Sequence, residues 1–149
     1  IYSADCSCGN WQANITYCAS AGSGGTGSDW INGVQLNTLS NTSGQTGYSD
    51  FRNQSTELVV GQSYNLTISL NYVFALDVAH AWIDFDRNGT FDNSELINMS
   101  AFDGANDSQG TVTVPNGTAV GATTLRVRAI YSNNPPADPC NDYFGEVED

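Results

Sequence analysis

Apolar and polar residues alternate along two stretches of this chain. In residues 64–71, Tyr, Leu and Ile alternate with Asn, Thr and Ser. In residues 125–131, Leu, Val, Ala and Tyr alternate with two Arg and one Ile. A period of two is typical of a strand with one buried face. Residues 73–83 predict a further, more apolar strand.

The remaining pattern predicts several short strands separated by turns. Further strands are expected at 29–39, with a bulge near Gly33, at 111–115 and near 14–17, and residues 58–60 form a short apolar segment before Gly61. Segments rich in Gly, Asn, Ser or Pro separate them at 21–28, 41–50, 115–117 and 133–139. No segment shows a convincing helical period. We therefore expect an all-β protein, an antiparallel β-sandwich of jelly-roll-like type.

Length and charge narrow the classes of protein. The 149 residues fit one domain, which we divide into an N-terminal arm pinned by disulfides (1–16) and a sandwich (17–149). The formal net charge is −12. Such a chain repels phosphate backbones and anionic membranes, so we expect no nucleic-acid or membrane partner. No apolar run approaches the roughly 20 residues of a membrane span.

Four cysteines indicate disulfides and a secreted, extracellular protein. We favour Cys18 with Cys140, which would tie the start of the domain to its end and leave Cys6 with Cys8. A bridge between Cys6 and Cys8 would be strained, so the crossed pairings stay open. A zinc site is not expected, because the chain has one His and no C-x-x-C spacing.

Residues 84–95, DFDRNGTFDNSE, match the twelve-residue pattern of a calcium loop. Gly89 occupies the sixth position, where the backbone turns sharply. The predicted ligands, at positions one, three, five, seven, nine and twelve, are Asp84, Asp86, Asn88, Thr90 through its carbonyl, Asp92 and Glu95. Ca²⁺ takes six to eight oxygen ligands, and this spacing directs them to one point.

Asp, Asn and Gly also form plain hairpin turns. The acidic residues at positions nine and twelve favour a calcium loop over a plain hairpin turn. The flanking residues have no long helical period, so a helix–loop–helix sensor is disfavoured. We expect a structural calcium clip between strands, in a fold otherwise built of β-sheet.

The C-terminal residues Gly145–Asp149 spell GEVED. Together with Tyr17-Cys18, Tyr48-Ser49-Asp50, Trp82-Ile83-Asp84 and residues 124–127, this motif resembles the GEVED domain family over residues 17–149. The resemblance implies a β-sandwich accessory module of secreted bacterial proteins, including proteases and polysaccharide-degrading enzymes. It also hints at a second calcium site at Glu146, Glu148 and Asp149.

Two departures from the family matter. Family members usually continue past GEVED into a final strand, whereas this chain stops at Asp149; either that strand has been trimmed, or residues 1–10 take its place. The Cys6–Cys8 arm lies outside the resemblance. The resemblance therefore indicates the kind of protein in which such a domain occurs rather than a specific activity.

We expect no enzymatic activity. The single histidine, His80, lies in a strand among Ala and Trp residues, where a structural role is commoner than general-base catalysis. No nucleophile motif with a credible orienting partner is present.

Binding is the remaining function class. Sugar-binding β-sandwiches stack aromatic rings on pyranose faces, and the candidate rings are Trp11, Trp30, Tyr131, Tyr143 and Phe144. Aromatic residues in strands are more often part of the core, as we expect for Trp82. Arg126 and Arg128 share a strand face. They either pair with nearby carboxylates or form a cationic strip for uronate or sulfate groups.

We therefore predict a non-catalytic, calcium-stabilised accessory module of a secreted enzyme that binds polysaccharide, acidic or sulfated chains included, as a monomer. The predicted ligand-binding residues are Trp30, Tyr131, Arg126, Arg128 and Tyr143. The alternative is a protein-binding, adhesion or interdomain spacer module, with the catalytic domain of the parent enzyme as a partner.

Overall fold

The computed structural model describes residues 15–20, 22, 29–132, 137–142 and 144–149, and within them the chain is all-β. The strands are β1 (Ile31–Leu36), β2 (Leu39–Thr42), β3 (Tyr48–Ser49), β4 (Ser63–Leu70), β5 (Asp77–Ile83), β6 (Leu96–Ile97), β7 (Asp107–Thr113), β8 (Leu125–Tyr131) and β9 (Gly145–Glu148). One short 3₁₀ helix, η1 (Asn93–Glu95), precedes β6. The predicted fold class is confirmed.

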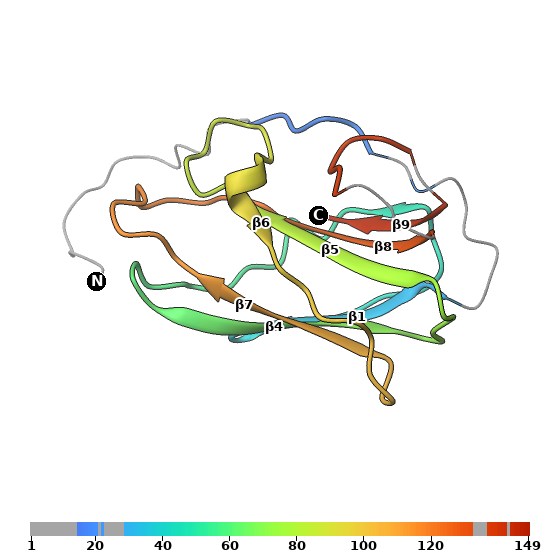
Figure 1. Ribbon diagram of the computed structural model, residues 1–149. Helices are drawn as coiled ribbons and strands as arrows, with labels where there is room; N and C mark the ends of the chain where they lie inside the picture. The colour runs from blue at the N-terminus through green and yellow to red at the C-terminus, as the bar shows by residue number, and fades with distance from the viewer. Residues whose placement is uncertain (1–14, 21, 23–28, 133–136, 143) are drawn as a thin grey trace.

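The strands form two stacked sheets (Figure 1). One sheet has the order β2-β1-β4-β7, and the other has the order β3-β9-β8-β5-β6. All pairs are antiparallel except β3 with β9, which is parallel. The β-sandwich therefore places β9, with the GEVED motif, inside the five-stranded sheet rather than at its edge.

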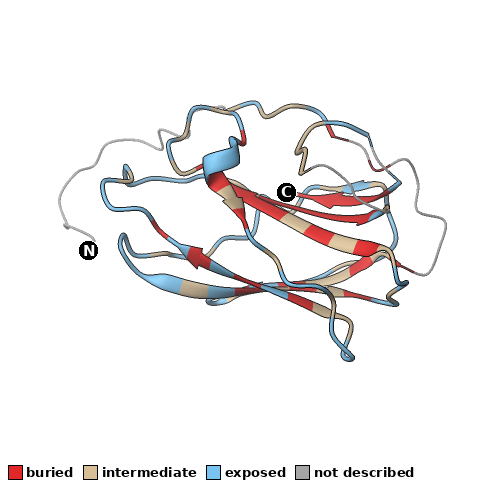
Figure 2. Ribbon diagram, viewed as in Figure 1, coloured by how far each residue is buried: buried red, intermediate tan, exposed pale blue. Residues whose placement is uncertain are grey.

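The alternation in β4 produces the core. Leu66, Ile68 and Leu70 are at most 2% exposed, whereas the two residues between them are half-buried. Residues of β1, β5, β7 and β8 pack against them, as the buried segments in Figure 2 show. Burying apolar side chains between the two sheets is the main favourable contribution to folding.

Some predicted strands differ from those observed. Residues 29–39 form no single strand, because the chain turns at Asn37 (φ 52°) and divides into β1 and β2; the predicted bulge lies between Ile31 and Gly33. β7 begins four residues before the predicted strand at 111. Its inward positions there are Ser108 and Gly110, which have no apolar side chain to reveal them.

Two short segments lie outside the strands, and for one of them, near residues 14–17, the sequence predicts a strand. Residues 58–60 are a loop, and Val59 is 57% exposed. Residues 15–17 are also irregular, and Asn14 lies outside the described residues. Neither segment has a neighbouring strand with which its backbone pairs.

The outer face of the five-stranded sheet is covered as well. Trp82, Arg126 and Arg128 are at most 2% exposed there, which confirms the buried position expected for Trp82. The predicted Cys18–Cys140 disulfide is present, with the two Cα atoms 5.6 Å apart, and its residues contact this face. Cys6 and Cys8 lie outside the described residues, as does most of the predicted arm.

No helix among the described residues is long and apolar enough to span a membrane.

Candidate functional site

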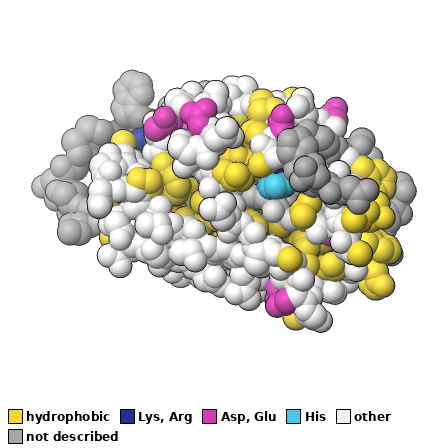
Figure 3. Space-filling view, viewed as in Figure 1, with side chains coloured by type: hydrophobic (Ala, Val, Ile, Leu, Met, Phe, Trp, Pro, Cys, Tyr) yellow, Lys and Arg dark blue, Asp and Glu magenta, His cyan; other side chains and the backbone are white. Residues whose placement is uncertain are grey.

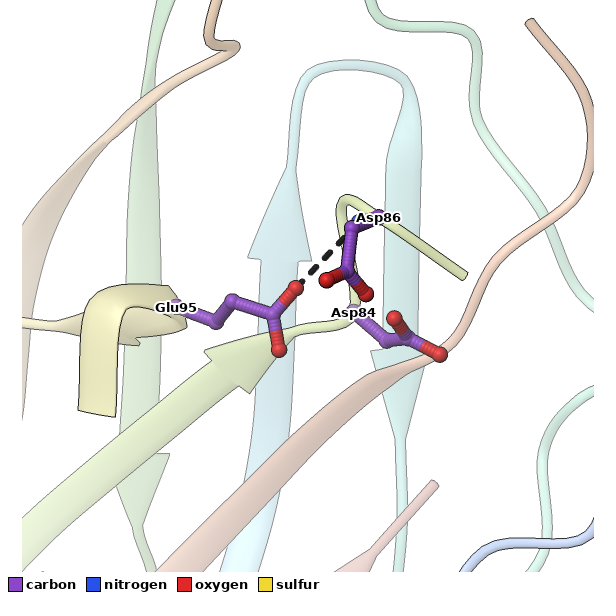
Figure 4. Close-up of side chains that lie close together, drawn as sticks. All are labelled: Asp84, Asp86 and Glu95. Carbon is purple, nitrogen blue, oxygen red and sulfur yellow. Dashed lines mark hydrogen bonds between the residues drawn. The ribbon is translucent and has the colours of Figure 1, made fainter. Parts of the chain in front are cut away.

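The predicted calcium loop connects β5 to β6, so it joins two neighbouring strands of one sheet. Asp84 follows β5 directly, and Glu95 reaches from η1 toward Asp84 and Asp86 (Figure 4). One carboxylate oxygen from each of these three residues lies within 4.8 Å of the other two. Asp84 and Glu95 are buried and Asp86 is exposed. This acidic group could hold a metal ion, and we call residues 84–95, which carry it, the metal loop.

Backbone amides hold the first two carboxylates in place. Asn88 N donates to Asp84 Oδ1 and to Asp86 Oδ1, at 3.1 Å in both cases, and Gly89 N donates to Asp84 Oδ2 at 3.0 Å. Gly89 has φ 84°, a conformation that favours glycine. The sharp turn predicted at the sixth position is therefore present, and it directs amide groups at the carboxylates.

Glu95 closes the loop at its other end. Its Oε1 accepts hydrogen bonds from Phe85 N at 2.7 Å and Asp86 N at 3.3 Å, and its Oε2 accepts from Asp92 N at 3.0 Å. One buried side chain thus ties the start of the loop to its end.

Asn88 and Asp92 lie at the exposed rim of the metal loop. Asn88 Nδ2 donates to Asp86 Oδ2 at 3.0 Å and to Asp92 Oδ2 at 3.2 Å, and Asn88 Oδ1 accepts from Thr90 N at 2.7 Å. The amide nitrogen, the positive end of the side chain, therefore faces the two carboxylates. A bound cation would instead require the oxygen there, so the EF-hand-like coordination is not confirmed.

The residues nevertheless fit a hard cation. Three carboxylates converge, and backbone amide donors surround them. Arg87, the arginine within the loop, donates outward to Val120 O at 2.9 Å. Like charges at this separation repel one another, and a cation between them relieves that repulsion. An all-oxygen donor set suits Ca²⁺ or Mg²⁺ rather than a softer metal.

Sequence reasoning did not assign Tyr17 to this site. Its hydroxyl donates to Asp84 Oδ2 at 2.8 Å, and its ring stacks on Phe91 of the loop with centroids 4.6 Å apart. Burial, and then the bond to Asp84, raise the pKa of Tyr17, so the phenol stays protonated and donates at neutral pH. The contact joins residues 67 positions apart, and only the Tyr17-Cys18 pair in the family resemblance pointed to it.

The hinted second calcium site is not found among the described residues, because Glu146 and Glu148 of β9 face the other sheet, whereas Asp149, which follows β9, does not. Glu146 accepts from Ile31 N at 2.8 Å and Thr46 N at 2.5 Å, toward the other sheet. Asp149 lies on the outer face, where Arg126 donates to it. Among the described residues, the metal loop carries the only group of acids, histidines or cysteines close enough to hold a metal ion.

The inward carboxylates of β9 are unusual in their environment. Glu146 is 3% exposed, and burial is the main cause that raises its pKa to about 7. Glu148, 4% exposed, accepts hydrogen bonds from Ser43 Oγ and from Asn41 Nδ2, and burial raises its pKa also. Neutral donors thus connect both carboxylates to the four-stranded sheet.

The prediction that Arg126 and Arg128 form a cationic strip on the surface is wrong. Arg126 and Arg128 share a strand face, as expected, but that face is covered, and they are 2% and 1% exposed. Arg126 pairs with Asp149, which is the alternative the sequence offered, and Arg128 donates to the carbonyl oxygens of Asp138 and Asn141 at 2.6 and 2.7 Å. Neither guanidinium faces solvent for a uronate or sulfate group.

The predicted aromatic residues lie in different places. Trp30 is half-buried just before β1, Tyr131 at the end of β8 is 41% exposed, and Tyr143 and Trp11 lie outside the described residues. The structure brings Tyr131 together with three other exposed rings, and we call Tyr72, Phe74, Tyr131 and Phe144 the aromatic cluster. Their exposed fractions lie between 41% and 52%.

Successive rings of the aromatic cluster contact one another edge to face. The centroids are 4.9 Å apart for Tyr72 and Phe74, 6.1 Å for Phe74 and Tyr131, and 6.3 Å for Tyr131 and Phe144. Apolar side chains gather at this end of the sandwich, near the connection between β4 and β5 (Figure 3). Sequence reasoning missed Tyr72 and Phe74 as binding residues, because it placed Phe74 within the strand predicted at 73–83, whereas β5 begins only at Asp77 and both rings lie in the connection before it.

The sequence of residues 78–149 matches the family model of the GEVED domain. This confirms the resemblance to the GEVED family. The match covers the strands from β5 to β9 and the whole metal loop, but not the N-terminal part of the resemblance, residues 17–77. No curated protein and no solved structure matched the chain.

Within the GEVED region, His80 is half-buried on the outer face, with its ring centroid 5.8 Å from that of Trp82. Burial, and then the charge of Arg128, lower the pKa of His80, so the imidazole is neutral at pH 7. Nothing in this arrangement tests catalysis, and the absence of enzymatic activity stays a prediction.

A cavity of about 530 Å³ lies between the sheets beside the end of β9. Aliphatic side chains form much of its lining, and three of its polar side chains bond to one another: Gln54 Nε2 donates to Asn41 Oδ1, and Asn41 Nδ2 donates to Glu148 Oε2.

Proposed function

We propose that this protein is a non-catalytic, calcium-stabilised accessory module of a secreted enzyme, and that its aromatic cluster binds polysaccharide. The observation that carries the proposal is the contiguous set of exposed rings at one end of the sandwich. Exposed apolar patches of this kind mark interaction sites. The match to the GEVED domain and the disulfide support an accessory role outside the cell.

We infer calcium rather than magnesium from the sequence, because the twelve-residue spacing of oxygen ligands is that of a calcium loop. Asp84, Asp86 and Glu95 would hold it, and Asn88, the Thr90 carbonyl and Asp92 would complete the shell. When bound, the ion supplies charge neutralisation and cross-links the loop between β5 and β6. A structural role follows, because the loop joins two strands of one sheet and has no pair of helices to open.

The distribution of charge favours a neutral polysaccharide over an acidic one. The chain has only four basic side chains other than histidine, all of them arginines. Arg52 pairs with Asp50, Arg87 donates to a backbone carbonyl, and the other two arginines are buried. With a net charge of −12, the protein repels uronates and sulfates at long range.

A protein partner is the second candidate. Neighbouring rings of the aromatic cluster meet at 61° to 85°, so they form no flat platform for several sugar rings in a row. Such a corrugated apolar surface also suits contact with another domain of the parent enzyme. The two candidate functions differ in the ligand that contacts these four rings: a polysaccharide in the first and another protein domain in the second.

Affinity electrophoresis against neutral, uronate and sulfated polysaccharides tests the proposal. We expect retardation by a neutral glycan, and about tenfold weaker binding for Phe74→Ala and Tyr131→Ala, because a lost ring contact costs about 1 kcal/mol or more. The matched control is Tyr48→Ala, which removes a ring that is 39% exposed but outside the cluster.

If no glycan retards the wild type, the protein-contact function replaces the glycan-binding one. If a glycan binds and both cluster variants match the wild type, the binding surface lies elsewhere.

A further inference from the structure

The segment Ile15–Ser20 lies against the metal loop although it is far from it in sequence. An added Cβ atom on Gly89 would lie 3.2 Å from Ile15 Cγ2 and 3.7 Å from the Thr16 carbonyl oxygen. Tyr17 donates to Asp84 at 2.8 Å. The N-terminal segment therefore contacts both the tight turn of the loop and its first carboxylate.

A second set of contacts connects the same loop to the disulfide. Phe91 of the loop is stacked by Tyr17, with an interplanar angle of 17°, and the Arg126 guanidinium lies 4.9 Å from the Phe91 ring centroid. The same guanidinium donates through Nη1 to Cys18 O and to Pro139 O, at 3.0 Å each. Phe91 and Arg126 thus link the metal loop to both sides of the Cys18–Cys140 bridge.

The position of the segment depends on these contacts and on the disulfide. Residues 15–20 belong to no strand, so no ladder of backbone hydrogen bonds fixes them to either sheet. Cys18 is covalently joined to Cys140 and directly follows Tyr17. Breaking the bridge would free Tyr17 to leave Asp84, because the segment would keep only a few side-chain contacts.

We propose that Tyr17 is a positioning residue for the metal site, and that the Cys18–Cys140 disulfide and a bound calcium ion stabilise each other through it. The inference rests on the calcium site proposed above. Hydrogen-bond partners of a ligating carboxylate fix its orientation, and losing one typically weakens metal binding about 10- to 100-fold. Linkage is reciprocal: if the disulfide strengthens calcium binding, calcium must favour the disulfide over the dithiol by the same factor.

Calorimetric titration with calcium alone tests the role of Tyr17. Tyr17→Phe keeps the ring that stacks on Phe91 and removes only the hydroxyl, so we expect a Kd about tenfold weaker than that of the oxidised wild type. Tyr64→Phe is the control, because Tyr64 lies in β4 of the other sheet, where its hydroxyl accepts a hydrogen bond from Val59 N at 2.9 Å. Its Kd should equal that of the wild type.

Redox equilibration in glutathione buffers, with and without calcium, tests the coupling. Alkylation and mass spectrometry of the peptides carrying Cys18 and Cys140 give the oxidised fraction. Calcium should shift the equilibrium constant toward the disulfide by about tenfold in the wild type, and by less in Tyr17→Phe. The variant that combines Cys18→Ser with Cys140→Ser should bind calcium more weakly by the same factor as the shift.

The outcomes separate the two proposals. Calcium binding by the oxidised wild type with equal affinity in Tyr17→Phe, or with no effect of calcium on the disulfide equilibrium, overturns this inference and leaves the proposed calcium site intact. No calcium binding by the oxidised wild type overturns both. If the double serine variant does not fold, the redox equilibrium of the wild type still decides the coupling.

Discussion

The two faces of strands β8 and β9 accommodate buried carboxylates in opposite ways. On the inner face, Glu146 has only neutral donors, two backbone amides, and its pKa rises to about 7. On the outer face, Asp149 meets Arg126 through two hydrogen bonds of 2.5 Å, with both side chains 2% exposed. Burial without a cation favours the protonated acid, whereas a paired cation keeps a buried carboxylate charged.

The metal loop is a third case. Its carboxylates converge as those of an ion pair do, but the cation must come from solution. The three regions therefore differ in where the compensating charge originates: from a side chain, from a bound ion, or from a proton. Removing each source in turn should give different losses of stability.

The largest loss is expected for Arg126→Met. Asp149 would remain buried without its cation, and breaking a buried pair from one side costs about 3–5 kcal/mol of unfolding free energy. The exposed pair of Arg52 with Asp50 is the control, since its side chains are 46% and 45% exposed and Arg52→Met should cost less than about 1 kcal/mol. Urea denaturation measures both, and similar losses would contradict the difference between a covered and an open ion pair.

Calcium should have the next largest effect. At a concentration 100 times its Kd, a ligand that binds only the folded state stabilises it by about 2.7 kcal/mol. We expect a higher thermal midpoint in calcium than in chelator for the wild type and for Glu57→Ala, which changes an exposed acid outside the loop. Asp84→Ala should abolish the rise. Equal wild-type midpoints by scanning calorimetry would refute the calcium site.

A smaller, pH-dependent effect is expected for Glu146. Its folded pKa of about 7 exceeds the ordinary value of 4.5, so the folded state binds more protons across that interval. The contribution of Glu146 to stability is therefore fully present below pH 4.5 and is lost as pH rises through 7, with a fall on the order of 2 kcal/mol between pH 5 and pH 7.

Urea denaturation at pH 5, 6, 7 and 8 in saturating calcium measures the slope. Glu146→Gln, which keeps one acceptor oxygen, should flatten it, and Glu57→Gln should leave it unchanged. An unaltered slope in Glu146→Gln would mean that Glu146 is ionised throughout this range, and that the inner face resembles the outer one more than its geometry indicates.

The sequence by itself determined the features that depend on local spacing. Alternation with a period of two predicted β4 and β8. The twelve-residue pattern placed Asp84, Asp86 and Glu95 in one loop, because residues so close in sequence are brought together by the local turns of the backbone. The GEVED motif could also be recognised from the sequence, because its residues are consecutive. Glycine at position 89 likewise indicated the turn that the backbone makes there.

Only the tertiary structure decided which faces are covered and which distant side chains meet. Alternation puts Arg126 and Arg128 on one face of β8 but does not show that the disulfide-linked segments bury that face. The bond from Tyr17 to Asp84 and the aromatic cluster join residues from separate strands and connections. A strand pattern specifies the direction of a side chain, whereas its neighbours depend on how both sheets and their connections pack.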